Sequence, residues 1–159
     1  MKLKIVAAAV AAFTALGSQA ASWDWGTHDS FESASTPVAA GAIFDTYSFS
    51  LGTASHVESG VLGFGGIVGG AYSLYSYGAD NMFGTNDDVG IGAWTFGGTN
   101  TVTLDAGSYY YTVLGGATKA TNYLIGSQVT AVPEPETYAL LGAGLGIIGF
   151  VASRRRRDF

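Results

Sequence analysis

Oxygen-bearing side chains crowd into one short segment of the chain, between Asp80 and Asp88. Calcium prefers hard oxygen ligands on a flexible segment, and Gly84 would permit a sharp turn around an ion. The spacing is not that of an EF-hand, since the segment has no Asp-x-Asp-x-Asp-Gly run and no closing glutamate. Two hypotheses therefore stay open, a calcium site and a solvated loop rich in Asx turns. The candidate calcium ligands are Asp80, Asn81, Asn86, Asp87 and Asp88.

Groups that could carry out catalysis are sparse in the rest of the chain. The only histidines are His28 and His56, there is no cysteine, and neither a Gly-x-Ser-x-Gly elbow nor a His-Glu-x-x-His motif occurs. Asp87 and Asp88 are neighbours, and adjacent side chains point apart in an extended chain, which disfavours the paired acids of a glycosidase. We therefore expect a protein that is not an enzyme and that has no cofactor other than the calcium of the first hypothesis.

The charges are divided unevenly along the chain. Between residues 21 and 131 the only lysine or arginine is Lys119, so this body carries a formal charge of about −8 although the whole chain carries −5. Such a body repels nucleic acid and anionic headgroups, so we expect neither as a partner of the body. The nine acidic residues of the body are Asp24, Asp29, Glu32, Asp45, Glu58, Asp80, Asp87, Asp88 and Asp105.

The body alternates polar and apolar residues as strands do, and no stretch of it keeps a helical period. The 24 glycines of the chain, with many Ser, Thr and Tyr, favour strands joined by tight turns. The turn residues Asp105-Ala106-Gly107 predict a hairpin over Thr99–Leu114. Short strands at this spacing predict an all-β fold, an antiparallel β-sandwich over residues 21–131. The seven predicted strands are Ile43–Leu51, Val57–Phe64, Ala71–Tyr77, Val89–Phe96, Thr99–Leu104, Ser108–Leu114 and Thr121–Val129.

One predicted strand carries a carboxylate on its apolar face. Alternate residues from Ile43 to Leu51 form that face, which includes Tyr47 and is interrupted only by Asp45. A buried carboxylate is costly unless it is paired or hydrogen-bonded. We therefore expect Asp45 to accept hydrogen bonds from nearby backbone or from a tyrosine hydroxyl, with Lys119 as an alternative partner.

Aromatic residues offer a binding alternative. Trp23 and Trp25 alternate as in a strand, and Tyr109, Tyr110 and Tyr111 lie in a predicted strand, so we expect most of these rings to pack in or on the core. The alternative is a carbohydrate-binding or adhesive module whose exposed rings, with Trp94, stack on sugars. Coplanar exposed rings on one face would favour that alternative.

Residues 1–20 have the three parts of a signal peptide. Lys2 and Lys4 form a positive start, an apolar run follows, and Ser18 and Ala20 occupy the two positions that signal peptidase inspects. The apolar stretch is too short to span a bilayer comfortably, which argues against an uncleaved anchor. We expect a signal helix that is removed by cleavage after Ala20.

Residues 132–159 differ from the body in their prolines, their long apolar stretch and their arginines. The segment Val132, Pro133, Glu134 and Pro135 is rigid and extended, because each proline fixes its own φ and biases the preceding residue away from helix. An apolar, glycine-rich stretch over 138–153 predicts a single transmembrane helix, short but able to span with its flanks. The four arginines behind it favour a cytoplasmic end; they are Arg154, Arg155, Arg156 and Arg157. On these grounds alone, an ordinary C-terminal anchor is equally consistent.

The Pro-Glu-Pro motif, apolar helix and basic end occur in the order of the PEP-CTERM sorting signal of Gram-negative bacteria, which residues 132–157 resemble. The resemblance implies a substrate of an exosortase, which would cut near the Pro-Glu-Pro after a transient stay in the inner membrane. The body would then be released or attached at the cell surface. Members of this group often accompany exopolysaccharide production, which makes exopolysaccharide an expected partner.

Two further resemblances concern the body. The string Ile43-x-Asp45-x-Tyr47 resembles the Phe-x-Asp-x-Phe signature of one PEP-CTERM subfamily, with Ile43 and Tyr47 in place of phenylalanine. The wider layout resembles bacterial prepeptidase C-terminal domains, through the Ser73–Tyr75 strand and the Leu104–Tyr109 segment. This resemblance implies a small, jelly-roll-like sandwich with an accessory or structural role. Together these features predict an exported, non-enzymatic surface or extracellular-matrix protein.

Overall fold

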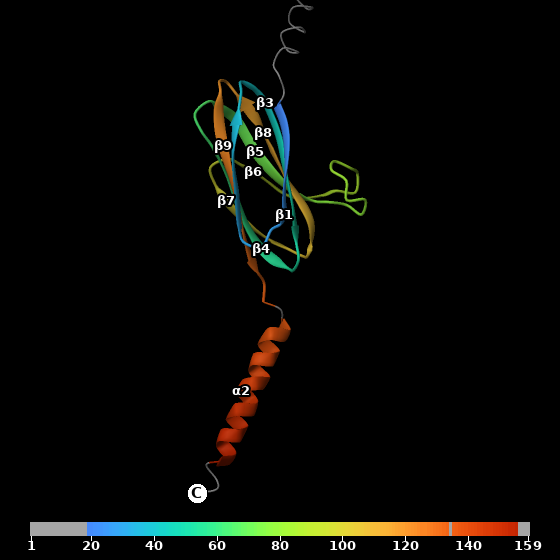
Figure 1. The fold of residues 1–159 in the computed structure, drawn as a ribbon, viewed down its shortest axis with the longest axis vertical. Coiled ribbons are helices and arrows are strands. Elements are labelled where there is room, and N and C mark those ends of the chain that lie inside the picture. Colours follow the sequence, from blue (N-terminus) through green and yellow to red (C-terminus); the bar gives the residue numbers. More distant parts are fainter. Residues whose placement is uncertain (1–18, 134, 156–159) are drawn as a thin grey trace, which may run out of the picture.

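The body of the chain is a β-sandwich with a helix extending from it (Figure 1). The computed structural model describes residues 19–133 and 135–155. Most of the predicted signal peptide, Glu134, Arg156 and Arg157 therefore lie outside the described residues. The elements are β1 (Gln19–Thr27), β2 (Phe31–Val38), β3 (Gly41–Leu51), β4 (Ser55–Gly63), β5 (Ile67–Ser76), β6 (Val89–Thr95), β7 (Thr99–Leu104), β8 (Gly107–Ala117), β9 (Thr121–Ala131) and α2 (Pro135–Arg155).

The strands form a five-stranded sheet in the order β1-β3-β8-β5-β6 and a four-stranded sheet in the order β2-β9-β4-β7. All seven predicted strands are present, which confirms the all-β prediction. Two more strands, β1 and β2, precede them. All pairs are antiparallel except β1 with β3, which is parallel. The sandwich is therefore mainly rather than wholly antiparallel.

The connections run between the sheets rather than within them. Only β5 and β6 are joined as sequence neighbours within one sheet. The predicted Thr99–Leu114 hairpin is therefore wrong, because β7 pairs with β4 while β8 pairs with β3 and β5. At Asp105–Gly107 the chain crosses to the other sheet, and the Tyr109 hydroxyl donates a hydrogen bond to the Asp105 carbonyl across this corner (2.9 Å).

The core between the sheets is rich in tyrosine. The face of β3 that the alternation predicts is buried throughout, from Ile43 to Leu51. Tyr47, Tyr72, Tyr111 and Tyr123 have no exposed surface. The core cluster contains only sandwich residues, from Val38 to Val129. Residues 21–131 therefore hold a complete core without any part of α2, as an independently folding domain requires.

The helix α2 begins at Pro135, and proline is well suited to a first helical position because its missing N–H is not needed there. Its 21 residues span about 31 Å at about 1.5 Å per residue, close to the thickness of a bilayer core. From Glu136 to Arg154 it is long and apolar enough to cross a membrane, and none of that stretch is buried by the rest of the chain. It leaves the sandwich as a separate rod (Figure 1).

Candidate functional site

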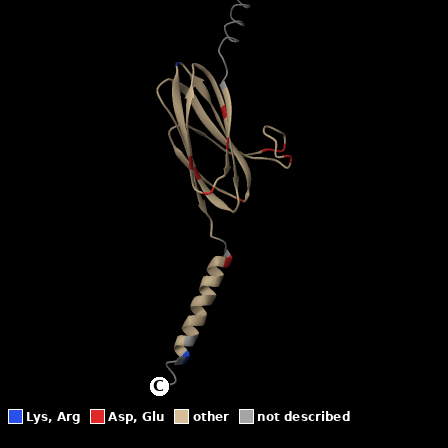
Figure 2. Cartoon of the chain, viewed as in Figure 1, with Lys and Arg blue, Asp and Glu red and all other residues tan. Residues whose placement is uncertain are grey.

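The acidic loop, residues 78–88, connects β5 to β6 and projects from the side of the sandwich (Figures 1 and 2). Asp88 fastens it. The Asp88 carboxylate accepts hydrogen bonds from the amides of Gly78 (3.0 Å), Gly84 (2.7 Å) and Thr85 (3.2 Å), and from the Tyr110 hydroxyl on β8 (2.7 Å). Desolvation works to raise the pKa of Asp88, but these four hydrogen bonds outweigh it, so the pKa is lowered.

The other two carboxylates of the acidic loop lie near the Thr85 hydroxyl, which is 2.6 Å from Asp87 Oδ1 and 3.3 Å from Asp80 Oδ1. Asp80 also accepts the Met82 amide (2.9 Å), which is an Asx turn. The bond from Thr85 is the main cause of a lowered pKa at Asp87. Asn81 has a positive φ of 52°, and the exposed Asn81 and Asn86 side chains make no hydrogen bond to described residues.

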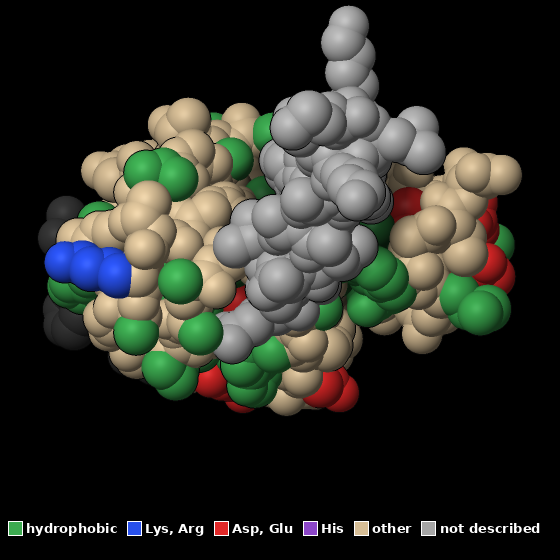
Figure 3. All heavy atoms as spheres, turned by 90° about the horizontal axis from the view of Figure 1, so that it is seen from above, with side chains coloured by type: hydrophobic (Ala, Val, Ile, Leu, Met, Phe, Trp, Pro, Cys, Tyr) green, Lys and Arg blue, Asp and Glu red, His purple; other side chains and the backbone are tan. Residues whose placement is uncertain are grey.

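These contacts show that the carboxylates cap the amides and hydroxyls of their own loop. Three of the five predicted calcium ligands, Asp80, Asp87 and Asp88, therefore share one hydrogen-bonded loop. Within the described residues, no group of three or more His, Cys, Asp or Glu side chains is arranged to hold a metal ion. Figure 3, seen from above, shows acidic and apolar side chains together on this projection. Calcium binding here stays a prediction.

The first prediction tests whether the acidic loop binds calcium. If Asp80 and Asp87 close on the ion after a small rearrangement, millimolar calcium raises the melting temperature of the body, because a ligand that binds only the folded state stabilises it. Differential scanning calorimetry with calcium and with EDTA measures this shift, and magnesium is the control. Equal melting temperatures in calcium and EDTA would end the calcium hypothesis.

The acidic loop also covers an aromatic patch on the outer face of the five-stranded sheet. Tyr110 stacks on Tyr75 (centroids 5.2 Å apart) and lies edge-on to Phe83 from the loop (4.9 Å). Tyr110 is only 3% exposed although it faces away from the core. We predicted that most of the rings of Tyr109, Tyr110 and Tyr111 would be buried. All three are, because Tyr109 and Tyr111 pack in the core and the acidic loop covers Tyr110.

Asp45 lies at the end of a buried chain of hydroxyls. It is 2% exposed and accepts hydrogen bonds from the Tyr123 hydroxyl (2.6 Å) and the Ala21 amide (2.9 Å). Because Tyr123 donates to Asp45, Tyr47 donates to Tyr123 (2.7 Å) and Thr36 to Tyr47 (2.7 Å). Burial, reinforced by the bond to Asp45, raises the pKa of Tyr123. This geometry agrees with the predicted backbone and tyrosine partners, and Lys119 instead packs beside Gly66.

A serine and a histidine also meet in the core, but without access to solvent. His28 Nε2 lies 2.8 Å from Ser127 Oγ, which also contacts the Tyr111 hydroxyl (3.0 Å). His28 and Ser127 are each 1% exposed, and His28 Nδ1 has no hydrogen-bond partner. Desolvation lowers the pKa of His28, which keeps it neutral. A nucleophile–base pair needs substrate access and a third group to orient the base, so this pair is structural.

The aromatic residues proposed as a sugar platform are occupied in packing. Trp23 stacks on Tyr47 (4.8 Å, 9° between planes), and Trp25 lies 5.3 Å from the same ring. Trp94 packs on Tyr72 (5.2 Å). All three indoles are half-buried against core tyrosines. They therefore do not form the coplanar exposed face that would favour the carbohydrate hypothesis.

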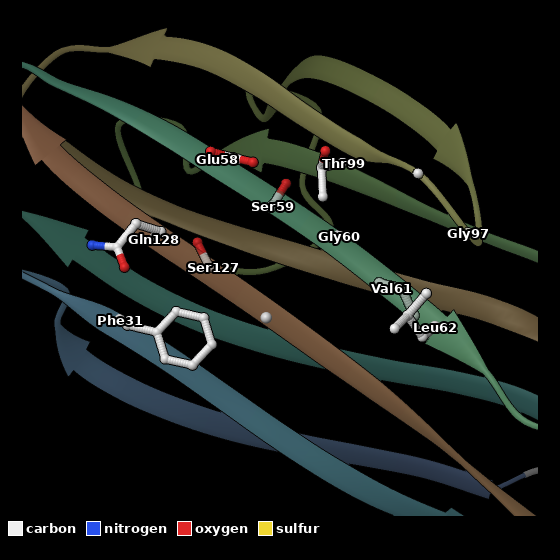
Figure 4. Close-up of a pocket in the computed structure, with 12 residues that line it drawn as sticks. Phe31, Glu58, Ser59, Gly60, Val61, Leu62, Gly97, Thr99, Ser127 and Gln128 are labelled. Carbon is white, nitrogen blue, oxygen red and sulfur yellow. The ribbon is translucent and has the colours of Figure 1, made fainter.

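The four-stranded sheet carries a groove of about 350 Å³ on its outer face (Figure 4). Gly60 and Gly126 are register partners and hollow out its centre. A Cβ on Gly60 would lie 2.9 Å from the Gly98 carbonyl oxygen, so only glycine fits there. Phe31, Gln128 and Glu58 form a row beside the two glycines, and Phe31 is 60% exposed. Sequence reasoning missed this groove, because Phe31 precedes the first predicted strand.

The predicted sorting segment begins where the sandwich ends. β9 ends at Ala131, and the Val132 amide donates the last hydrogen bond to the sandwich, to the Ala54 carbonyl (2.9 Å). Pro133 then leads to α2, whose exposed Arg154 lies at the far end. Cleavage anywhere beyond Val132 would therefore leave every strand pair intact.

Comparison with protein families places a known signal on this segment. Residues 131–157 match the family described as PEP-CTERM protein-sorting motif. The motif implies an exported protein that is processed by an exosortase, with a membrane-anchoring C-terminal helix. It is a sorting signal and not an enzymatic family. No curated protein matches the chain.

Solved structures share the fold of the body at low sequence identity. A periplasmic inhibitor of g-type lysozyme, PliG from Aeromonas hydrophila, has 9% identity and a TM-score of 0.51, covering 72% of this chain and 100% of that one. The pre-peptidase C-terminal domain of a collagenase from Bacillus anthracis has 14% identity and a TM-score of 0.48, covering 70% and 97%. At these identities the similarity concerns the fold alone.

Proposed function

We propose that this chain is an exported, non-enzymatic protein of the cell surface or extracellular matrix, delivered by its own tail. The signal peptide takes it through the inner membrane, α2 holds it there with Arg154–Arg157 on the cytoplasmic side, and an exosortase cuts near Val132–Pro135. The observation that carries this proposal is the sorting motif at residues 131–157, which includes a helix whose described stretch Glu136–Arg154 is not buried by the body.

The body's chemistry supports a structural role. Its histidine–serine pair is sealed in the core, and its acidic loop satisfies its own backbone. With a charge of about −8, the released body would stay soluble and would not adhere to nucleic acid. The likeness of Ile43, Asp45 and Tyr47 to the FxDxF signature, and the subfamily that it suggests, remain part of this proposal.

Mass spectrometry of the mature protein from its host tests the sorting proposal. We expect a mass that lacks residues 1–20 and the residues beyond the Pro-Glu-Pro motif. A strain without the exosortase is the control and should retain Phe159 in the membrane fraction. An intact Phe159 in cells that contain the exosortase would refute C-terminal processing.

The second candidate function is binding of exopolysaccharide, and the groove on the four-stranded sheet is the surface that favours it. An exposed ring can stack on the apolar face of a sugar, while amide and carboxylate groups bind its hydroxyls. Phe31 offers such a ring, with Gln128 and Glu58 beside it. The exposed Glu58 side chain has no hydrogen-bond partner among the described residues.

Replacing this ring tests the groove. We expect Phe31→Ala to reduce retention of the body on the host's exopolysaccharide about fivefold, since stacking contributes on the order of 1 kcal/mol. A pull-down with the purified polymer measures retention. Phe64→Ala is the matched control, because Phe64 is also exposed but lies outside the groove. Equal retention of both variants would remove the groove from consideration.

A further inference from the structure

The Asp45 carboxylate is buried without a charged partner. Its two hydrogen-bond donors are a tyrosine hydroxyl and a backbone amide, and both are neutral. Removing a carboxylate from water costs several kcal/mol unless a cation or several donors compensate. The body's only lysine, Lys119, packs beside Gly66 instead. The protein therefore buries an acidic side chain and supplies no side-chain cation for it among the described residues.

The predicted signal-peptide cleavage would convert one of those two donors from an amide into an amine. The amide that lies 2.9 Å from Asp45 Oδ1 belongs to Ala21, the residue that follows the predicted cleavage site. Hydrolysis of the Ala20–Ala21 bond consumes one water molecule. The leader departs with a carboxylate on Ala20, and the nitrogen of Ala21 becomes an amine that is protonated at neutral pH. The same atom then carries a positive charge.

We propose that the α-ammonium group of Ala21 in the processed chain is the counter-ion of Asp45, so that signal-peptide cleavage creates a partly buried ion pair that the precursor lacks. This inference rests on the proposed export of the chain. It assigns the Asp45 side chain as a receptor for the new N-terminus. A charge-assisted hydrogen bond is about twice as strong as a neutral one, so the bond to Asp45 strengthens on cleavage.

The new terminus is held in place by the strand that it begins. In β1, Ala21 pairs with Asp45, Ser22 with Thr46 and Trp23 with Tyr47. The stack of Trp23 on Tyr47 lies two residues from the terminus and fixes the strand against β3. Cleavage removes only the first two pairs, those of Gln19 and Ala20, and Ala20 is exposed. The ammonium group therefore stays in register with the carboxylate.

The other titratable groups that face Asp45 are neutral at physiological pH. They are the hydroxyls of Tyr47 and Tyr123, and burial raises the pKa of both. The ion pair should raise the pKa of the Ala21 amine above its ordinary value of about 8. The stability that the pair supplies is then present below about pH 8 and is lost as the pH rises through the raised value.

The test compares two forms of the body, one beginning at Ala21 and one that keeps Gln19 and Ala20. Both are released from a fusion protein in the cytosol, so that the result does not depend on export or sorting. We expect Asp45→Asn to lower the melting temperature at least twice as much in the form that begins at Ala21. We also expect the Ala21 amine to titrate above about pH 9 in the wild type and near 8 in the variant, as followed by NMR.

Asp24→Asn is the matched control, because Asp24 is an acid of β1, the strand that begins at the new terminus. Its carboxylate accepts hydrogen bonds from Gly26 (2.9 Å) and Ser48 (3.1 Å) on the exposed side. It should change both forms equally. Equal losses for Asp45→Asn in the two forms would overturn the proposal, as would an ordinary pKa for the wild-type amine. The NMR titration of the wild-type Ala21 amine needs no variant, so this test remains valid even if Asp45→Asn does not fold. An exported chain whose first residue is not Ala21 would also overturn it.

Discussion

Replacing Tyr111 by alanine is expected to destabilise the sandwich by about 3–5 kcal/mol, the range seen when a large buried ring is removed. Tyr111 has no exposed surface and lies on β8, with β3 and β5 on either side. Its ring stacks on Phe49 (5.2 Å) and contacts Tyr72 (6.3 Å). A domain of this size is stabilised by about 5–15 kcal/mol, and this one has no disulfide to compensate. Urea denaturation of residues 21–131 measures the loss.

Tyr111→Phe is the control for this prediction. It keeps the ring and removes only the hydroxyl, which lies 3.0 Å from Ser127 Oγ. Ser127 retains its contact with His28, so the expected cost is only about 1 kcal/mol. Similar losses for the two variants would mean that the hydroxyl, and not ring packing, carries the stabilising effect of Tyr111.

Placing two aspartates in α2 is expected to abolish both membrane retention and tail processing. Each aspartate near the centre of a transmembrane helix costs about 2.5–3.5 kcal/mol on the insertion scale. The stretch Glu136–Arg154 has a mean hydropathy of only 1.4, so two charged residues would remove most of its tendency to insert into a membrane. Leu145→Asp with Ile148→Asp should therefore move the precursor from the membrane to the soluble fraction with Phe159 intact. Fractionation and mass spectrometry check both results.

Valine at the same two positions is the control, because it keeps the helix apolar. The valine variant should be retained and processed as the wild type is. If the aspartate variant were still cut beyond Pro133, the exosortase would recognise the Pro-Glu-Pro segment without the membrane helix, and the anchoring part of the proposed function would be wrong.

The sequence predicted the strands that alternate strongly. The apolar face of Ile43–Leu51 and the hydrogen-bonded state of Asp45 are both as predicted, because a period of two and the cost of a lone buried charge leave few alternatives. β2 was missed, because it is a polar edge strand with proline at position 37, where no partner strand needs the N–H. Its half-buried Ala34 and its buried Thr36 and Val38 are small, which weakens the alternation.

The errors concern contacts that are distant in the sequence. The turn at Asp105–Gly107 has the composition of a hairpin, and a corner between two sheets uses the same residues, so local rules cannot separate them. The burial of Tyr110 by the acidic loop depends on Asp88, 22 residues away. The groove at Gly60 and Gly126 requires knowledge of the register between β4 and β9. None of these can be inferred from spacing alone.

The sheet topology decides when each strand can find its partner during export. β9 lies between β2 and β4, so the four-stranded sheet cannot close until the last strand has been translocated. Such non-local pairing makes folding slow compared with the closure of local hairpins. The tail follows β9 directly, so α2 reaches the bilayer just as folding becomes able to finish. We therefore expect the anchor to keep a slowly folding chain at the membrane, and the cut beyond β9 to release it once the last strand is paired.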